Sequence, residues 1–393
     1  MVYFCNMENL DIYKSFHSCF KQTEIGGRYI TNKNLENFLE GINNEITKSV
    51  LAHSVLGKPI WLLDIGTGKT KLLIWSQMHG NESTTTKAIF DFVSFLISDN
   101  KAAKKLREEF TFKIIPILNP DGAELYTRPN AINIDLNRDF IDLTQPESKA
   151  LMNLFEIFAP DFCFNMHDQR TIFSVGDTDR PATISFLAPS YNDTCEINEN
   201  RAIAIKVIVQ MNKVLQSHIP GQIGRFDDGY NRNCVGDTFQ TLGVPTILFE
   251  AGHYPDDYQR EVTREIVFIS LIAACESIAN KTYVVNRTAE YMNIPQNKTL
   301  FYDFVYKNVK INYDGNEILS IFAAQYKEVL KDGSISLIPY ISEVNVSEEI
   351  KGHVEYDGEF GLFSDNFGNY PVEDRLANFR IGEKRYLNGH FLK

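Results

Sequence analysis

The most regular pattern along the chain is a series of short apolar runs that stop abruptly at polar residues. Leu72-Leu73-Ile74-Trp75 is the first clear example, and the residues that follow it include His79 and Glu82. Four to eight apolar residues bounded by turn residues predict a buried strand, and the helical spacing of apolar residues from Thr85 to Ile97 predicts a helix. His79 and Glu82 are therefore expected on a loop that leads from a strand into a helix.

The same alternation of strand and helix continues to about residue 280. It is typical of an α/β fold with a mixed, largely parallel central sheet and helices on both faces. The carboxyl ends of parallel strands share one edge of the sheet, where ligands bind in open α/β folds. We therefore expect one site that gathers the polar residues at four strand ends, which are His79, Asn119, His167 and Glu250. Strands are predicted at 59–65, 72–75, 112–118, 161–166 and 244–249, and helices at 85–97, 102–109, 146–158, 195–218 and 256–279.

The pattern changes from about residue 286. Asp-Gly dipeptides at 314–315, 332–333 and 357–358 separate short segments of alternating polarity, which predicts β-hairpins. The remainder of the chain, 286–393, is therefore predicted to form a smaller, mainly β domain.

Length and composition allow more than one domain. The chain has 393 residues, of which 44% are hydrophobic, so it can bury a large core. We divide it into an N-terminal leader segment at 1–58, a catalytic domain at 59–283 on which that segment packs, and the C-terminal domain at 286–393. The leader is predicted to contain one helix, from Leu35 to Val50.

The charge and the apolar content exclude several classes of partner. A net charge of −12 and a pI near 5.2 argue against nucleic acid or an anionic membrane, since either would require a basic face. The longest apolar stretch, Phe268–Cys275, is too short to span a bilayer, and residues 1–28 lack a secretory signal pattern. The six cysteines include no Cys-x-x-Cys pair, as expected of free thiols in a reducing cytosol. The sequence therefore predicts a cytoplasmic protein and leaves its oligomeric state open.

The residues at the predicted sheet edge have the chemistry of a hydrolytic metal site. Zinc accepts His nitrogen and Glu oxygen at roughly 2 Å, and catalytic zinc sites use three protein ligands and keep a fourth position for water. His79, Glu82 and His167 fit this description, and Glu250 is a further carboxylate at the same edge. The spacing of His79 and Glu82 alone is also compatible with a surface turn that binds nothing.

Taken together, the motifs resemble those of a known enzyme family. In order and approximate spacing, the chain is similar to the carboxypeptidase A-like zinc carboxypeptidases, the funnelin metallocarboxypeptidases, in an intracellular bacterial form. The resemblance extends over about residues 60–280. It rests on His79-Gly80-Asn81-Glu82, Asn119-Pro120-Asp121-Gly122, Arg128, Asp135-Leu136-Asn137-Arg138-Asp139-Phe140, His167 and Leu248-Phe249-Glu250.

The resemblance implies a reaction centre built around one Zn²⁺ ion per chain. It implies His79, Glu82 and His167 as zinc ligands, and Glu250 as the general base that takes a proton from the activated water and delivers it to the leaving amine. Zinc lowers the pKa of water to about 7, and a carboxylate on the open side can accept the proton. The alternative for Glu250 is a strand-end acid paired with a surface lysine.

The same resemblance implies residues that hold the substrate. Arg138 and Asn137 match the pair that binds the terminal carboxylate, and Arg128 matches the residue that polarises the scissile carbonyl. Asp135 resembles the carboxylate that receives the other ring N–H of the first zinc histidine. Tyr230 is the candidate for the mobile tyrosine over the substrate. Structural ion pairs of the two arginines with Asp135 or Asp139, and a plain loop role for Asp135, remain alternatives.

We therefore predict a zinc metallocarboxypeptidase that removes the C-terminal residue of a peptide. The first alternative is a zinc-dependent deacylase of N-acyl amino acids, similar to succinylglutamate desuccinylase and aspartoacylase, which the C-terminal β segment and Arg170 favour. Either substrate, a peptide or an N-acyl amino acid, has a free carboxylate. The second alternative is a non-catalytic zinc-binding interaction protein.

Overall fold

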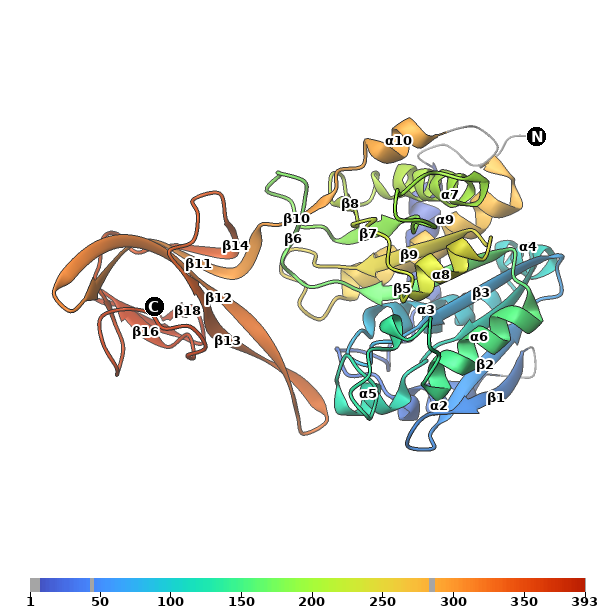
Figure 1. Ribbon diagram of the computed structural model, residues 1–393, viewed down its shortest axis with the longest axis horizontal. Coiled ribbons are helices and arrows are strands. Elements are labelled where there is room, and N and C mark those ends of the chain that lie inside the picture. The colour runs from blue at the N-terminus through green and yellow to red at the C-terminus, as the bar shows by residue number, and fades with distance from the viewer. Residues whose placement is uncertain (1–7, 43–45, 283–286, 393) are drawn as a thin grey trace. The chain divides into compact units, whose positions relative to one another are not determined.

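The computed structural model describes residues 8–42, 46–282 and 287–392. The chain divides into two compact units, which are coloured by residue number in Figure 1. Unit 1 comprises Met1–Gln169 and Ala182–Asn297, and unit 2 comprises Arg170–Pro181 and Lys298–Lys393. The chain thus passes between the units three times, whereas the sequence pattern predicts a single passage near residue 286.

Unit 1 contains an eight-stranded sheet with the order β1-β2-β4-β3-β5-β9-β7-β8. The neighbours β4, β3, β5 and β9 are parallel, and antiparallel pairs join β1 to β2, β2 to β4 and β7 to β9. This mixed, largely parallel sheet confirms the predicted fold class. The strands are β1 Thr47–His53, β2 Pro59–Ile65, β3 Thr70–Ser76, β4 Phe110–Ile115, β5 Phe162–Asp168, β7 Ile184–Leu187, β8 Ile223–Arg225 and β9 Thr246–Ala251.

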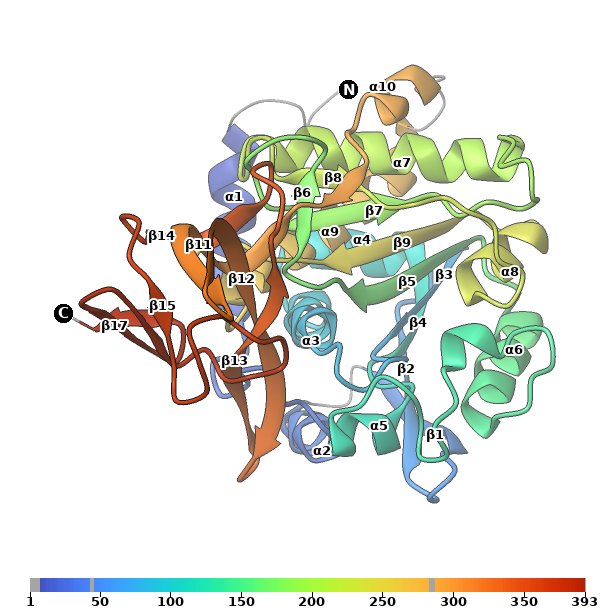
Figure 2. The same ribbon diagram turned by 60° about the vertical axis from the view of Figure 1, so that its left-hand side comes forward.

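Helices cover both faces of this sheet (Figure 2). Successive side chains of a strand point to opposite faces. Accordingly, Leu72 and Ile74 pack with α3, α7 and α9, whereas Leu73 and Trp75 pack with α6 and α8. All four residues are fully buried, which explains why β3 is a continuous apolar run. The helices are α1 Glu8–Phe20, α2 Asn32–Gly41, α3 Thr84–Leu96, α4 Lys101–Glu109, α5 Pro120–Leu125, α6 Pro146–Phe158, α7 Glu199–Leu215, α8 Val235–Thr241, α9 Glu261–Ala279 and α10 Thr288–Met292.

Two elements near the edges of the sheet differ from the sequence prediction. The predicted helix from Leu35 to Val50 is wrong in its second half, because α2 ends at Gly41 and Thr47–His53 forms the edge strand β1. Residues 43–45 lie outside the described residues. The three-residue strand β8, which pairs with β7, lies between the predicted helix at 195–218 and the predicted strand at 244–249, where the sequence pattern predicts no strand.

Unit 2 is built mainly of β-strands. One four-stranded sheet has the order β13-β12-β11-β14, and a second has the order β15-β16-β17-β18. The predicted hairpins at Asp314-Gly315 and Asp332-Gly333 are present, and all four residues have positive φ, as type I′ turns require. The predicted hairpin at Asp357-Gly358 is wrong, because β14 pairs in parallel with β11 and the next strand, β15, pairs with β16. The strands are β11 Phe301–Tyr313, β12 Asn316–Lys331, β13 Ser334–Val344, β14 Lys351–Asp357, β15 Phe363–Ser364, β16 Phe379–Ile381, β17 Lys384–Leu387 and β18 His390–Leu392.

A small sheet and a buried amide mark the passages between the units. β6 (Phe173–Val175) pairs with β10 (Asn297–Thr299). On the side of unit 1, the side chain of Gln169 donates to the carbonyl oxygen of Ala182 and accepts from the side chain of Asn297, both at 2.8 Å. One amide therefore joins the residues of unit 1 at all three passages.

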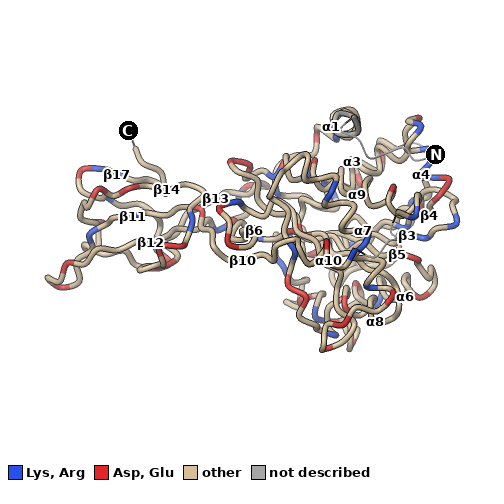
Figure 3. The backbone as a smooth tube through the Cα atoms, turned by 90° about the horizontal axis from the view of Figure 1, so that it is seen from above, with Lys and Arg blue, Asp and Glu red and all other residues tan. Residues whose placement is uncertain are grey.

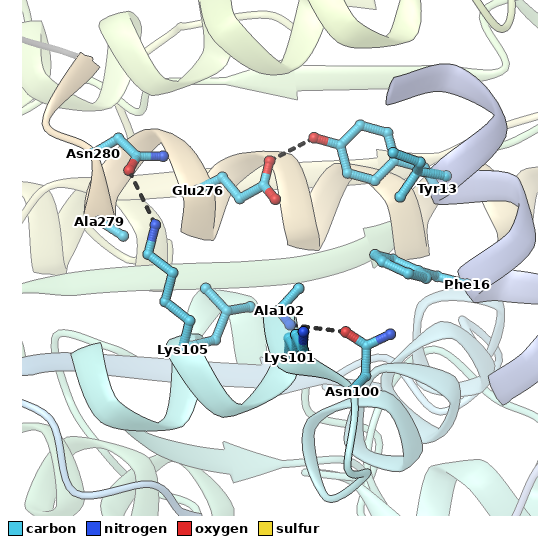
Figure 4. Close-up of a pocket in the computed structure, with 11 residues that line it drawn as sticks. Tyr13, Phe16, Asn100, Lys101, Ala102, Lys105, Glu276, Ala279 and Asn280 are labelled. Atoms are coloured by element: carbon cyan, nitrogen blue, oxygen red, sulfur yellow. Dashed lines mark hydrogen bonds between the residues drawn. The ribbon is translucent and has the colours of Figure 1, made fainter. Parts of the chain in front are cut away.

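A cavity of about 380 Å³ lies among α1, α4 and α9 in unit 1. Its walls include Phe16 and Leu106, and Figure 4 shows Tyr13 donating to Glu276 across it. None of the predicted site residues lines this cavity.

Charged residues of both signs are distributed along the chain, as the coloured tube of Figure 3 shows. Within the described residues, no helix is both long and apolar enough to cross a membrane.

Candidate metal centre

Parallel strands bring the predicted site residues to one edge of the sheet in unit 1. His167 lies near the end of β5 and is the register partner of Glu250 on β9. His79 and Glu82 lie on the loop between the neighbouring strand β3 and α3. This is the strand-to-helix loop that the sequence pattern predicts.

The loop that carries His79 is held against the start of α5. Gln77 has a positive φ of 48°, and its side chain donates to the carbonyl oxygen of Gly80 at 2.8 Å. A Cβ atom on Gly80 would lie 1.9 Å from the carbonyl carbon of Gly122, so only glycine allows this approach. The side chain of Asn119 accepts from Gly122 N and donates to Met78 O. Asn119 thus fixes the loop, and the backbones of the two motifs touch at Gly80 and Gly122.

His79, Glu82 and His167 form a compact buried cluster. Their side chains are at most about a tenth exposed. Nδ1 of His79 lies 2.8 Å from Oε1 of Glu82, Nδ1 of His167 lies 2.9 Å from Oε2 of Glu82, and the two Nδ1 atoms are 3.1 Å apart. Bonds of roughly 2 Å in a tetrahedral zinc site separate two ligand atoms by about 3.3 Å. Across the described ranges, no other group of three His, Cys, Asp or Glu residues comes together in this way.

The polarity of the cluster fits a bound cation. Nε2 of His79 lies 3.0 Å from Oδ1 of Asp135, so a neutral His79 places its ring proton on Nε2 and donates it to Asp135. Nδ1 of His79 then directs a lone pair at the Glu82 carboxylate. Two acceptors at 2.8 Å repel unless a proton or a metal ion lies between them. The donor set of the cluster therefore suits a divalent metal such as zinc.

The pKa shifts of the cluster show that it attracts positive charge, which a proton on His79 or a metal ion can supply. Burial lowers the pKa of His79, but the carboxylates of Glu82 and Asp135 outweigh burial and raise it overall. Burial would raise the pKa of Glu82, yet His79 and His167 hold that pKa well below its usual range. Burial lowers the pKa of His167 although Glu82 opposes it. An ionised carboxylate and a neutral imidazole are the forms that bind a metal.

Asp135 and Arg128 surround the cluster from the loop after α5. Arg128 NH1 donates to Oε1 of Glu82, and Arg128 Nε donates to Oδ2 of Asp135, both at 3.1 Å. Burial would raise the pKa of Asp135, but His79 and Arg128 lower it overall. Arg128 thus makes the ion pair with Asp135 that was one alternative, and its side chain is also 46% exposed beside the cluster.

Asn137 and Arg138 lie on a short 3₁₀ turn, Leu136–Arg138, beside the N-terminus of α8. The Asn137 side chain accepts from the backbone N–H of Val235 at 3.0 Å. NH1 of Arg138 donates to Asn137 O at 2.7 Å and lies 3.1 Å from Sγ of Cys234. Among the described residues, Arg138 forms no ion pair with a carboxylate, and its side chain is exposed.

Tyr230 lies at the other end of α8. Its hydroxyl is 3.3 Å from Oγ1 of Thr241, the last residue of that helix. Seven residues of helix span roughly 9–10 Å, so the hydroxyl is well separated from Asn137 at the first turn. The structure does not bring Tyr230 to the cluster, and its role over the substrate stays a prediction.

Glu250 is a buried carboxylate next to the cluster. Burial raises its pKa well above the usual range, and the negative charges of Glu82 and Asp168 act in the same direction. Arg128 and Arg260 oppose this shift. A divalent cation held by the cluster would also oppose it.

Two residues that the sequence analysis did not single out also belong to this edge. Asp168 follows His167 and accepts from the backbone of α3, and Arg260 donates to backbone carbonyls at the ends of β5 and β9. The first turn of α3, Thr84-Thr85-Thr86, has no acidic residue of its own. Other helices, such as α2 and α4, share this feature, so the sequence carries no distinct signal for the role of Asp168.

Comparison with known proteins gives a consistent picture. Residues 32–205 match the family model described as "Zinc carboxypeptidase", a range that includes the cluster and ends before Glu250. The chain is 34% identical over 113 residues to Probable carboxypeptidase 2 of Trichophyton verrucosum, which is 28% of this chain and 21% of that protein. It is 29% identical over 128 residues to Cytosolic carboxypeptidase 3 of Bos taurus, which is 29% of this chain and 13% of that protein. The match to the first relative spans about a fifth of that relative's length.

Solved structures show the same fold. A metallo-carboxypeptidase from Burkholderia cenocepacia superposes with a TM-score of 0.52 at 19% identity, over 65% of this chain and 70% of that chain. Thrombin activatable fibrinolysis inhibitor superposes with a TM-score of 0.53 at 14% identity, over 70% of this chain and 81% of that chain. At these identities the likeness concerns the fold alone.

Proposed function

Since the chain belongs to the zinc carboxypeptidase family, we propose that it is a zinc-dependent metallocarboxypeptidase that hydrolyses the C-terminal peptide bond of peptides. The observation that carries the proposal is the buried convergence of His79, Glu82 and His167, with Glu250 on the neighbouring strand. Two histidines and one carboxylate leave a coordination position open, as in catalytic zinc sites. One zinc ion per chain is proposed for this position.

Zinc held by these residues would lower the pKa of water to about 7 and polarise a carbonyl group. Glu250 is proposed to carry out both proton transfers. Its carboxylate accepts a proton from water as the water oxygen bonds to the scissile carbonyl carbon, and gives that proton to the amine when the C–N bond breaks. Burial and the charges of Glu82 and Asp168 raise the pKa of Glu250, and a cation held by the cluster would lower it towards the range in which the ionised carboxylate accepts a proton. The products are a shortened peptide and a free amino acid.

Three side chains are proposed to bind and polarise the substrate. The Arg138 guanidinium forms no ion pair with a described carboxylate, so it can accept the terminal carboxylate of the peptide, with Asn137 beside it. Arg128 lies against Glu82 with nearly half of its side chain exposed, so it can donate to the scissile carbonyl oxygen where negative charge develops.

The proposed location is the cytoplasm. The described cysteines, Cys19, Cys163, Cys195, Cys234 and Cys275, are free thiols, as in a reducing compartment. One relative carries the name Cytosolic carboxypeptidase 3.

The decisive experiment is mass spectrometry of a mixed library incubated with the zinc-loaded protein. The library contains peptides with free or amidated C-termini and a set of N-acyl amino acids. We expect shortening by one residue only where the C-terminus is free, and no product from a Glu250→Gln control. Intact peptides beside deacylated amino acids would instead assign the protein to the deacylases. Zinc binding without any hydrolysis would favour the non-catalytic interaction protein.

A second experiment tests the ligand set. His167→Ala is expected to lose the zinc of the wild-type protein in elemental analysis, because only two ligands remain. His218→Ala is the matched control, since His218 lies outside the cluster and is expected to leave zinc content unchanged. One zinc per chain in His167→Ala would remove His167 from the ligand set.

A further inference from the structure

Asp168, the last residue of β5, caps the N-terminus of α3, the helix that follows the loop of His79 and Glu82. α3 begins at Thr84, and its N-cap residue Ser83 makes no capping hydrogen bond through its side chain. The first N–H groups of a helix need acceptors from outside that helix. Oδ2 of Asp168 accepts from Thr84 N at 2.9 Å, and Oδ1 accepts from Thr85 N at 3.2 Å. A carboxylate from β5 thus supplies the acceptors that the α3 sequence lacks.

The same residue also bonds directly to a proposed metal ligand. The backbone N–H of Asp168 donates to Oε2 of Glu82 at 3.2 Å, and Glu82 is two residues before Thr84. The Asp168 side chain is only 3% exposed. Asp168 therefore connects the loop that carries His79 and Glu82 to the strand that carries His167, through both its backbone and its carboxylate.

Arg260 extends this connection to the third segment of the site. Its NH1 lies 3.8 Å from Oδ2 of Asp168 and donates to the carbonyl oxygen of Ala251, the residue after Glu250. Its NH2 donates to the carbonyl oxygen of Gln169. The Asp168 carboxylate and the Arg260 guanidinium are both almost completely buried, so solvent screens their attraction little.

We propose that Asp168 is a positioning residue of the metal site, which fixes the Glu82 loop against the His167 strand and so prearranges the zinc ligands. This inference rests on the proposed function, because it requires zinc at His79, Glu82 and His167. Removal of groups that orient metal ligands typically weakens metal binding by roughly 10- to 100-fold. A role as a helix cap alone would alter the stability of the metal-free protein and leave its zinc affinity unchanged.

The test measures zinc affinity and stability separately. Zinc Kd is determined by competition with a chromophoric chelator, and urea unfolding midpoints are measured for the metal-free proteins. The variants are Asp168→Ala, Asp168→Asn and His167→Ala. The matched control is Asn100→Ala, because Asn100 caps α4 by accepting from Ala102 N at 2.8 Å and lies outside the site.

The expected result is a roughly 10- to 100-fold higher zinc Kd for Asp168→Ala and a smaller increase for Asp168→Asn, which keeps one acceptor oxygen. Asn100→Ala should lower the unfolding midpoint and leave zinc Kd unchanged. An unchanged Kd in Asp168→Asn, beside lost affinity in His167→Ala, would overturn the positioning role alone, even if Asp168→Ala does not fold. Wild-type affinity in His167→Ala would overturn the proposed function as well.

Discussion

Two of the buried clusters of charged residues in unit 1 differ in how well their members are paired. The first cluster, which we call the Asp91 cluster, lies between α3 and α9. In it, Arg264 of α9 donates to both carboxylate oxygens of Asp91 of α3 at 2.6 Å. Gln22 N donates to the same carboxylate, and Nε2 of His17 lies 3.3 Å from it. The cluster at the sheet edge instead directs two imidazole nitrogens and a carboxylate at one point.

The difference separates a structural ion pair from a binding site. A buried charge is costly unless it is paired and hydrogen-bonded, and Asp91 and Arg264 satisfy each other. His79, Glu82 and His167 are better satisfied by a cation than by one another, as the facing acceptors at 2.8 Å indicate. Both clusters are buried, so burial does not distinguish them. The metal site is distinguished by the lone pairs of His79, Glu82 and His167, which converge on one another.

The largest effect is expected from Glu250→Gln. Loss of the general base should lower kcat by roughly 10²- to 10⁴-fold and leave the zinc content of the protein unchanged. Steady-state kinetics and elemental analysis on the same preparation would check this. Asp91→Asn is the comparison within the other cluster, and its kcat per folded molecule should be that of the wild type. Wild-type turnover in Glu250→Gln would remove this residue from the mechanism.

The next effect concerns stability alone. Arg264→Ala leaves Asp91 buried without its main partner, which should lower the free energy of unfolding by about 3–5 kcal/mol. Urea unfolding of the metal-free protein measures this, and zinc Kd should not change. Lys104→Ala breaks the exposed pair of Lys104 with Asp99 and should leave the free energy of unfolding almost unchanged, because solvent screens this pair. Equal losses in the two variants would show that the Asp91 cluster is no stronger than a surface pair.

A smaller loss of activity is expected from Arg128→Ala. Removal of a donor to the developing oxyanion typically lowers kcat by roughly 100-fold or more. Arg138→Ala should act mainly on KM for peptides with a free C-terminus, because its proposed partner is the substrate carboxylate. Kinetics on one peptide and its C-terminal amide would separate the two arginines. A kcat near the wild-type value in Arg128→Ala would leave that residue only its ion pairs with Glu82 and Asp135.

The smallest effect concerns Glu261, which borders the Asp91 cluster. Lys87, Lys21 and Arg264 outweigh partial burial and lower the pKa of Glu261 to about 2, whereas burial lowers the pKa of Lys87 despite Glu261. A depressed carboxyl pKa stabilises the fold above the unfolded value of about 4.5. That contribution, at most roughly 3 kcal/mol and less after solvent screening, should be lost as pH falls from about 4.5 to 2. Urea midpoints across this range should fall less steeply in Glu261→Gln than in the wild type.

The sequence predicts the centre of unit 1 well because burial there follows a simple rule. Strands such as β5 are covered on both faces and read as apolar runs that end at the site. β1 is an edge strand with no fully buried residue, so its sequence does not distinguish it from the end of a helix. β8 has only three residues and is recognisable mainly through its pairing with β7.

Some parts of the site could not be predicted, because they depend on contacts between residues that are far apart in the sequence. His79, Glu82 and His167 carry a motif, whereas Asp168 acquires its partners only when β5 and α3 come together. Asp91 and Arg264 are separated by 173 positions, and nothing local pairs them. The position of Tyr230 depends on the path of the loop before α8, which has few apolar residues to fix it.

The threefold passage of the chain between the units has a consequence for synthesis on the ribosome. Arg170–Pro181 emerges long before Lys298–Lys393, with which it forms unit 2. Until then, the backbone of β6 has no strand partner, because β10 has not yet been made. At typical elongation rates of about 5–20 residues per second, this delay lasts several seconds. During that time the carbonyl oxygen of Ile172 lacks the backbone donors that Leu300 and Phe301 later supply, so this segment reaches its final pairing only when the last part of unit 2 has been made.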